Sequence, residues 1–135
     1  MYYLGLDVGS SSVKAALVEA KSGKSIQSVH EPKNEMSISS LKNDWAEQDP
    51  NVWWKYTCTA IKRVCKESNI DPKKIISIGI SYQMHGLVIV DKNGEPLRDS
   101  IIWCDSRAVN IGNDAYEKLG EDKCMTHLLN SPGNF

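Results

Sequence analysis

The sequence has few cysteines, no long apolar run and no excess of charge of one sign. Its four cysteines are irregularly spaced and form no C-x-x-C pair, so we expect free, mostly buried thiols and a reducing, cytoplasmic location. The apolar runs are only a few residues long, too short to span a bilayer. The first four residues lack the basic segment that begins a signal peptide.

The charged residues are balanced and scattered along the chain. Lys and Arg number 16 and Asp and Glu number 17, which gives a formal net charge of -1. Nucleic acids and anionic membranes are bound by basic faces, so we expect neither as a partner. A length of 135 residues predicts about one domain, with a composition ordinary for a globular protein.

The first third of the chain predicts three antiparallel strands, over residues 2–8, 13–20 and 25–30. Turns rich in Gly and Ser separate them at residues 9–12 and 21–24. The periodicity of residues 13–20 fits helix or strand, but eight residues between two turns favour a strand. Residues 32–44 have no clear period and are typical of a long loop.

One helix is strongly indicated after this loop. Asp49 suits the N-cap, and Pro50 suits the first helical position, where its missing N–H is not needed. The helix should end near Asn69. Its apolar face recurs at helical spacing, through Trp53, Tyr56, Thr57, Ala60, Ile61 and Val64.

The remaining elements predict a mixed α/β fold. Residues 75–81 read as a strand that is apolar on both faces and therefore central. Shorter strands are expected at 87–90 and 100–103, and a loop-like tail at 124–135. Asp105 or Ser106 should cap a helix that ends at Gly120. That helix should bury Ala108, Ile111, Ala115 and Leu119. The order of elements differs from the strand–helix alternation of a doubly wound dinucleotide-binding fold.

The first candidate site is the turn after the first strand. Asp7 ends that strand, and Ser10, Ser11 and Ser12 form the turn, followed by Lys14. Backbone N–H groups, hydroxyls and a lysine suit an anion such as phosphate, and the carboxylate suits Mg²⁺, directly or through water. Neither a Walker A loop nor G-x-G-x-x-G is present, and an ordinary Gly-Ser hairpin turn is the alternative.

Two further candidates follow the later strands. Gln83 and His85 can exchange hydrogen bonds with a polyol, and Gly86 allows close backbone approach; a structural or solvated histidine is the alternative. Trp103 offers a flat face to a sugar, and Asp105 and Arg107 can pair or bind hydroxyls. A buried Trp followed by a helix cap and an exposed Arg is the alternative there.

Taken in order, these segments resemble the N-terminal domain of the FGGY family of carbohydrate kinases. The opening run resembles the family's first phosphate loop, and the Trp-Ala-Glu-Gln-Asp-Pro run at 45–50 resembles the stretch before its first helix. Residues 79–86 are similar to the substrate segment of xylulokinases in particular, although gluconate kinases have a similar Met-His pair. Residues 101–107 resemble the family's next substrate-side segment.

The resemblance implies a ribonuclease H-like (actin-like ATPase) fold, incomplete in this chain. Residues 1–135 would form the N-terminal part of the N-terminal domain, with the C-terminal domain and the catalytic base Asp lying beyond Phe135. The implied reaction is phosphorylation of D-xylulose to D-xylulose 5-phosphate by ATP and Mg²⁺, and the isolated chain is expected to be inactive. A gluconate-type kinase and a non-catalytic sugar-binding module are the alternatives. For the oligomeric state of the parent enzyme, a homodimer is one option that the resemblance leaves open.

The resemblance also implies roles for individual residues. Asp7 would act in catalysis on the phosphate and metal side, with Ser10, Ser11, Ser12 and Lys14 at the phosphates of ATP. Met84 and His85 would bind the ketopentose, with Gln83, Trp103 and Asp105 as further sugar contacts. We expect Asp7 and the Met84–His85 pair to face a common crevice.

Overall fold

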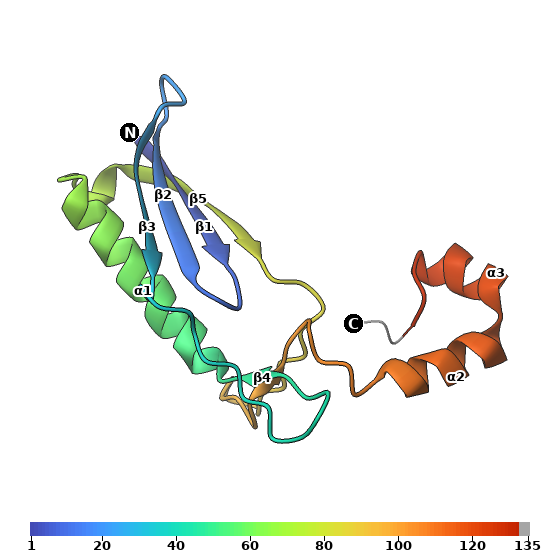
Figure 1. The fold of residues 1–135 in the computed structure, drawn as a ribbon. Coiled ribbons are helices and arrows are strands. Elements are labelled where there is room, and N and C mark those ends of the chain that lie inside the picture. Colours follow the sequence, from blue (N-terminus) through green and yellow to red (C-terminus); the bar gives the residue numbers. More distant parts are fainter. Residues whose placement is uncertain (133–135) are drawn as a thin grey trace.

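A four-stranded mixed sheet with one long helix packed against it makes up the N-terminal part of the fold (Figure 1). The structure is a computed structural model that describes residues 1–132. Strands β1 (Tyr2–Val8), β2 (Val13–Glu19) and β3 (Ser25–Glu31) are antiparallel neighbours, as predicted. Strand β5 (Ile75–Tyr82) runs parallel to β1, so the sheet order is β3-β2-β1-β5.

Helix α1 (Pro50–Glu67) begins where the sequence predicts. The Asp49 side chain accepts a hydrogen bond from the backbone N–H of Asn51 at 2.9 Å, and Pro50 is the first helical residue. The helix ends at Glu67, with Ser68 as C-cap, two residues before Asn69. Asn69 itself has a positive φ of 52°, which stops further helix.

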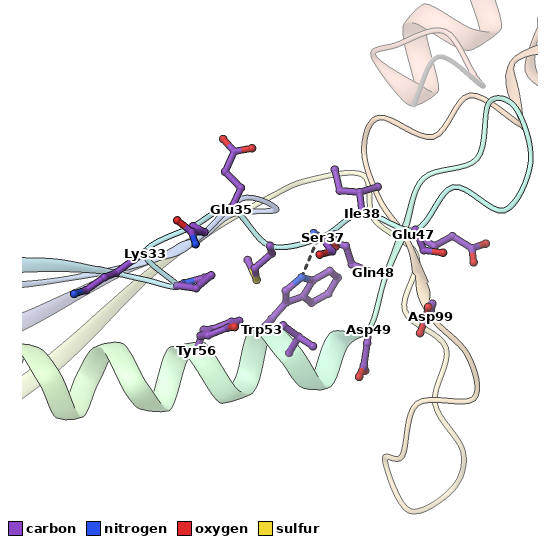
Figure 2. Close-up of a pocket in the computed structure, with 15 residues that line it drawn as sticks. Lys33, Glu35, Ser37, Ile38, Glu47, Gln48, Asp49, Trp53, Tyr56 and Asp99 are labelled. Carbon is purple, nitrogen blue, oxygen red and sulfur yellow. Dashed lines mark hydrogen bonds between the residues drawn. The ribbon is translucent and has the colours of Figure 1, made fainter.

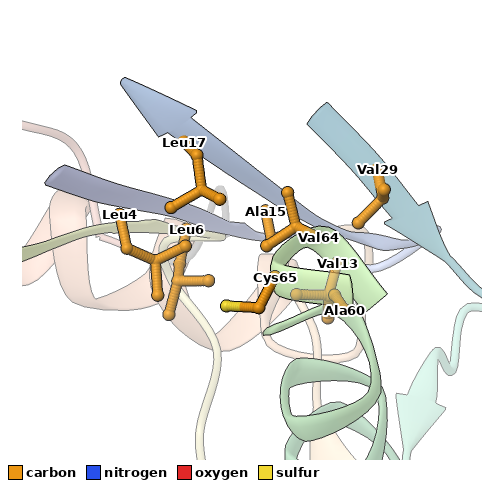
Figure 3. Close-up of a cluster of buried hydrophobic side chains, with 9 residues drawn as sticks. All are labelled: Leu4, Leu6, Val13, Ala15, Leu17, Val29, Ala60, Val64 and Cys65. Carbon is orange, nitrogen blue, oxygen red and sulfur yellow. The ribbon is translucent and has the colours of Figure 1, made fainter. Parts of the chain in front are cut away.

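The hydrophobic core lies between α1 and the sheet (Figure 3). Alternate residues of each strand point to opposite faces, and one face of β1, β2 and β3 meets the helix. The core consists of Leu4, Leu6, Val13, Ala15, Leu17, Val29, Ala60, Val64 and Cys65. The four cysteines are free thiols; burial raises the pKa of the Cys65 thiol, while Cys104 is exposed.

Strand β5 lies at the edge of the sheet, and the prediction that it is central and apolar on both faces is wrong. Within residues 1–132 its only strand neighbour is β1, and Ser77, Gly79 and Ser81 occupy one face. On the other face α1 covers β2 and β3 but leaves β5 open (Figure 1). This leaves an apolar row, here called the β5 stripe, whose members are 50–67% exposed: Ile76, Ile78, Ile80 and Tyr82.

The segment after β5 departs further from the prediction. The strand expected at 87–90 is absent, because Leu87 and Val90 form only single bridges, to Ile101 and Pro96. A short sheet of two strands, β4 (Glu47–Gln48) and β6 (Ser100–Ile101), replaces the longer strand expected at 100–103. A 3₁₀ turn, η1 (Pro72–Lys74), precedes β5.

The C-terminal helices lie apart from the sheet (Figure 1). Helix α2 (Val109–Leu119) ends before Gly120 as predicted, but neither Asp105 nor Ser106 caps it. Its apolar face is not buried either, since Ile111 is 72% exposed and the buried residue of α2 is Gly112.

The tail predicted to be a loop, residues 124–135, instead begins with a helical turn that follows the short helix α3 (Glu121–Lys123). Helix α3 leads into this π-helical turn, η2 (Cys124–Leu128), and Cys124 is buried. Residues 133–135, the end of the expected loop, lie outside the described residues. None of the helices within residues 1–132 is long and apolar enough to cross a membrane.

We predict that the chain self-associates through the β5 stripe, because an open sheet edge beside exposed isoleucines offers backbone pairing and apolar burial together. Replacing Ile78 and Ile80 by Lys should shift the chain toward monomer in sedimentation velocity. Replacing Ile111 and Leu119 by Lys, which places the same two charges on exposed positions of α2, is the matched control and should change nothing. A concentrated wild-type sample that remains monomeric would contradict this prediction.

Candidate functional site

The turn between β1 and β2 is tight and places Asp7 beside Lys14. The Gly9 N–H donates to the Ser12 carbonyl at 3.0 Å, and a Cβ at Gly9 would lie 3.2 Å from the same oxygen. Asp7 and Lys14 are cross-strand partners with 3.6 Å between Oδ2 and Nζ. Their side chains are 51% and 66% exposed, so this ion pair is weak and leaves both groups available to a ligand.

A buried glutamine anchors this turn to α1. Gln48 donates from Nε2 to the Ser10 carbonyl at 2.7 Å and to the Ser37 carbonyl at 3.2 Å. Its Oε1 accepts from Trp53 Nε1 at 3.0 Å, the dashed line in Figure 2. Gln48 was not among the site residues predicted from sequence, and the available signal was its place in the 45–50 run of the family resemblance.

Trp103 reaches the same turn from the other side. Its indole Nε1 donates to Ser10 Oγ at 3.1 Å, although the two residues are 93 positions apart. The indole is about half exposed, which leaves ring surface for a ligand. The structure therefore joins a residue predicted to bind phosphate to one predicted to bind sugar.

The segment after β5 forms a hollow of about 490 Å³. The Gln83 N–H donates to the Val8 carbonyl at 2.9 Å, which extends the β1–β5 pairing by one step. The hollow is lined by Val8, Trp53, Tyr82, Gln83, Met84, His85, Gly86 and Val88.

His85 holds an unusual backbone conformation in this hollow. Its φ is 63°, in the left-handed region that non-glycine residues seldom adopt. Such strain concentrates at ligand-binding segments. A Cβ at Gly86 would meet the Ile101 carbonyl at 3.4 Å, so the glycine lets this segment approach β6 closely.

The buried carboxylate of Asp105 accepts hydrogen bonds from both the backbone and Arg107, so these protein groups occupy it in place of a ligand. Oδ2 accepts from the Ala46 N–H at 2.7 Å and from Arg107 Nη2 at 2.6 Å. Arg107 also donates to Glu47 at 2.6 Å, and its guanidinium lies 3.7 Å over the Trp45 ring. Of the two uses expected for Asp105 and Arg107, pairing with each other or binding hydroxyls, the structure shows the pairing.

This ionic cluster shifts the ionisation of its members. Burial alone would raise the pKa of the Asp105 carboxyl, but hydrogen bonds from Arg107 and Ala46 outweigh it, and the net pKa is lowered. The hydrogen bond to Asp105 is the main cause of a raised pKa at Arg107. Arg98 completes the cluster by pairing with Glu47. Two segments that flank the site are thus held together by buried charges.

The predicted site residues come together only in part. Asp7 lies near the end of β1 and the Met84–His85 pair follows β5, and because these strands are parallel neighbours both lie at the same end of the sheet. Asp7, however, lines a different hollow, of about 410 Å³, together with Lys14 and His30. A third hollow, of about 630 Å³ under the 32–39 loop, is lined by none of the predicted site residues (Figure 2).

The carboxylates of the site offer Mg²⁺ at most an open site. Within residues 1–132, no group of three or more His, Cys, Asp and Glu side chains is placed to hold a metal ion. Mg²⁺ commonly takes one or two carboxylates and draws its other ligands from water and substrate phosphates. Asp7, a single exposed carboxylate, fits that mode and does not fit a closed protein cage.

Residues 2–131 match the model of the N-terminal domain of the FGGY family of carbohydrate kinases. The chain belongs to this family. A xylulose kinase of Staphylococcus epidermidis is 40% identical over 104 residues, which are 77% of this chain and 20% of that protein.

Solved structures of FGGY kinases share the fold. A xylulose kinase from Brucella ovis (TM-score 0.79, 33% identity) matches 87% of this chain and 24% of its own. A gluconate kinase from Lactobacillus acidophilus has the same TM-score at 30% identity, covering 93% of this chain and 24% of its own. The chain thus spans about a quarter of the length of its structural relatives. These likenesses confirm the predicted family and the incomplete mixed α/β fold.

We predict that Asp105→Asn lowers the free energy of unfolding at pH 7 by about 3 kcal/mol, because it removes one charge of a buried pair. The folded pKa of Asp105 is lowered, so its contribution is complete above the unfolded value of ~4 and disappears as pH falls through the folded pKa. Urea unfolding from pH 7 to pH 3 should therefore show the wild type converging on the variant. Parallel curves over that range would contradict this prediction.

Proposed function

We propose that this chain is the N-terminal part of an ATP-dependent sugar kinase, and that it supplies parts of the phosphate-binding and sugar-binding sides of one cleft. The hydrogen bond between Ser10 and Trp103 is the observation that carries the proposal, because it joins the first turn to a substrate-side segment. A terminal phosphoryl group and a sugar hydroxyl must meet for transfer, so their binding groups must be neighbours.

The acceptor that we propose is a ketopentose, D-xylulose, which is converted to D-xylulose 5-phosphate. The names of the Staphylococcus epidermidis and Brucella ovis relatives support this choice. D-Gluconate is the second candidate, supported by the name of the Lactobacillus acidophilus neighbour, whose fold matches equally well.

The roles proposed for the residues follow from chemistry and position. Asp7 lies on the phosphate side and would hold Mg²⁺, directly or through water. Ser10, Ser11, Ser12 and Lys14 would contact the phosphates. Met84, His85 and Trp103 would hold the sugar. Asp105 would act through the segment that carries Trp103, since its carboxylate is already bonded to Ala46 and Arg107.

Bound Mg²⁺ would neutralise charge on the phosphates as the γ-phosphoryl group moves. The base that accepts the proton of the sugar hydroxyl is proposed to lie in the remaining three quarters of the enzyme. Phosphoryl transfer depends on positioning and charge stabilisation from both walls of a cleft, so we propose that the isolated chain is inactive.

The test is a coupled ADP-release assay on the complete kinase and on the isolated chain, with D-xylulose, D-gluconate and glycerol as acceptors. The proposal expects the largest kcat/KM with D-xylulose and no turnover by the isolated chain. A preference for D-gluconate would establish the second candidate. ADP release at the same rate with and without each of the three acceptors would overturn both candidates.

We predict that Asp7→Ala in the complete kinase lowers kcat by about 10²–10³-fold, the usual loss when one group that stabilises transition-state charge is removed. Binding of D-xylulose, measured by calorimetry, should be largely unchanged, because Asp7 lines a different hollow from Met84 and His85. Asp114→Ala, an exposed carboxylate on α2, is the control. Near-normal turnover in Asp7→Ala would remove Asp7 from the mechanism.

We predict that His85→Ala weakens the binding of D-xylulose by ~0.5–3 kcal/mol, the range for a lost hydrogen bond. Alanine also disfavours the positive φ at this position, so His85→Asn is the informative companion, since asparagine tolerates that conformation. Equal losses in both variants would assign the effect to the imidazole. Unchanged affinity in His85→Ala would exclude His85 from the sugar site.

A further inference from the structure

Three separate segments of the chain are joined by the amide of Gln48, which is buried in β4. Nε2 donates to the Ser10 carbonyl in the β1–β2 turn at 2.7 Å and to the Ser37 carbonyl in the 32–39 loop at 3.2 Å. Oε1 accepts from the Trp53 indole of α1 at 3.0 Å (Figure 2). One orientation of the amide satisfies all three bonds, because an indole N–H can only donate and a carbonyl can only accept.

The backbone of the β1–β2 turn is oriented by bonds to its carbonyl groups. The Ser10 carbonyl accepts from Gln48, and the next carbonyl, that of Ser11, accepts from the Met36 N–H at 2.9 Å. Gln48 also bonds to Ser37, the neighbour of Met36. Both carbonyls of the turn therefore face the same wall of the protein.

The N–H groups of the turn consequently face the other way. In a planar trans peptide the N–H and the C=O point in opposite directions, and the peptides of this turn are trans. The Ser11 N–H is thus opposite the Ser10 carbonyl, and the Ser12 N–H is opposite the Ser11 carbonyl. Both donors are directed away from the wall that Gln48 forms, and successive N–H groups of this kind suit an anion such as phosphate.

We propose that Gln48 is a positioning residue for phosphoryl transfer: its amide holds the Ser10 carbonyl, and this directs the Ser11 N–H toward the phosphates of ATP. The inference rests on the proposed function, because it deepens the role of the phosphate-side turn. Gln48 itself touches no substrate, since it is buried behind the turn and bonded through both its nitrogen and its oxygen. Its contribution therefore belongs to the transfer step, in which the position of the phosphoryl group matters most.

The experiment compares variants of the complete kinase, with ATP and D-xylulose varied in turn. Gln48→Met removes the donor to Ser10 and should lower kcat by roughly 10–10²-fold, the loss expected when a group is slightly misplaced. KM for D-xylulose should be nearly unchanged, because Gln48 lies outside the lining of the sugar-side hollow. Trp53→Phe removes the indole bond and leaves the bond to Ser10, so it should lower kcat much less.

Two further variants separate positioning from stability. Val64→Ala opens a cavity in the core between α1 and the sheet without touching the turn, so it lowers stability and should leave kcat unchanged. Gln48→Glu replaces Gln48→Met if circular dichroism shows that Gln48→Met does not fold. At a pH where the introduced carboxyl is ionised, it offers an acceptor to Trp53 but no donor to Ser10, so the same loss of kcat is expected.

The outcomes that overturn the inference are distinct from failure of the proposed function. A kcat near the wild-type value in a folded Gln48 variant overturns the inference. An equal loss of kcat in Val64→Ala, or a loss confined to KM for D-xylulose, also overturns it. So does failure of both Gln48 variants to fold, because Gln48 then serves the fold alone. If the unsubstituted kinase phosphorylates none of the three acceptors, the proposed function fails before any variant is compared, and the inference fails with it.

Discussion

The parallel pairing of β1 with β5 is the constraint on which the site depends. Neighbouring parallel strands have their carboxyl ends at the same end of the sheet, so the loops that follow the two strands begin side by side. One loop carries Ser10 and the other carries Met84 and His85, and they are more than 70 positions apart in sequence. The bond from the Gln83 N–H to the Val8 carbonyl carries this pairing up to the site itself.

Buried polar side chains then fix the segments that the sheet does not reach. Gln48 connects the first turn to α1, and the Asp105–Arg107 pair connects the segment after β6 to the stretch before α1 through bonds to Ala46 and Glu47. A buried ion pair is weak evidence for stability, because desolvation opposes attraction, but it selects one arrangement strongly. We interpret the cluster around Arg107 as the device that holds Trp103 in position beside Ser10.

The sequence predicted the first half of the fold well, because local signals decide it. Turns of Gly and Ser bound β1 and β2, and Asp49 followed by Pro50 marks the start of α1. The errors lie where nonlocal packing decides. The isoleucines of β5 correctly indicated a strand, but no local pattern tells a central position from an edge. Likewise Asp105 has the features of a helix cap, yet its carboxylate accepts from the distant Ala46 N–H and from Arg107, which also bonds to the distant Glu47.

The site was predicted through the family resemblance more than through local chemistry. Residue type and order identified Ser10, Met84, His85 and Trp103 as candidates, and the structure joins Ser10 to Trp103. The hydrogen bonds by which Gln48 connects the first turn to α1 were not predicted, because a single glutamine ahead of a helix belongs to no motif with a characteristic spacing. The left-handed φ of His85 was equally hidden, since only coordinates reveal backbone strain.

The bond between Trp103 and Ser10 has a thermodynamic corollary. A ligand that moves the indole changes the environment of the hydroxyl, and a ligand that recruits the hydroxyl changes the freedom of the indole. Linkage makes such an influence reciprocal: if occupancy on one side alters affinity on the other, the reverse effect has the same factor. One 3.1 Å contact thus couples a ligand bound beside the Ser10 hydroxyl directly to a ligand bound beside the Trp103 indole.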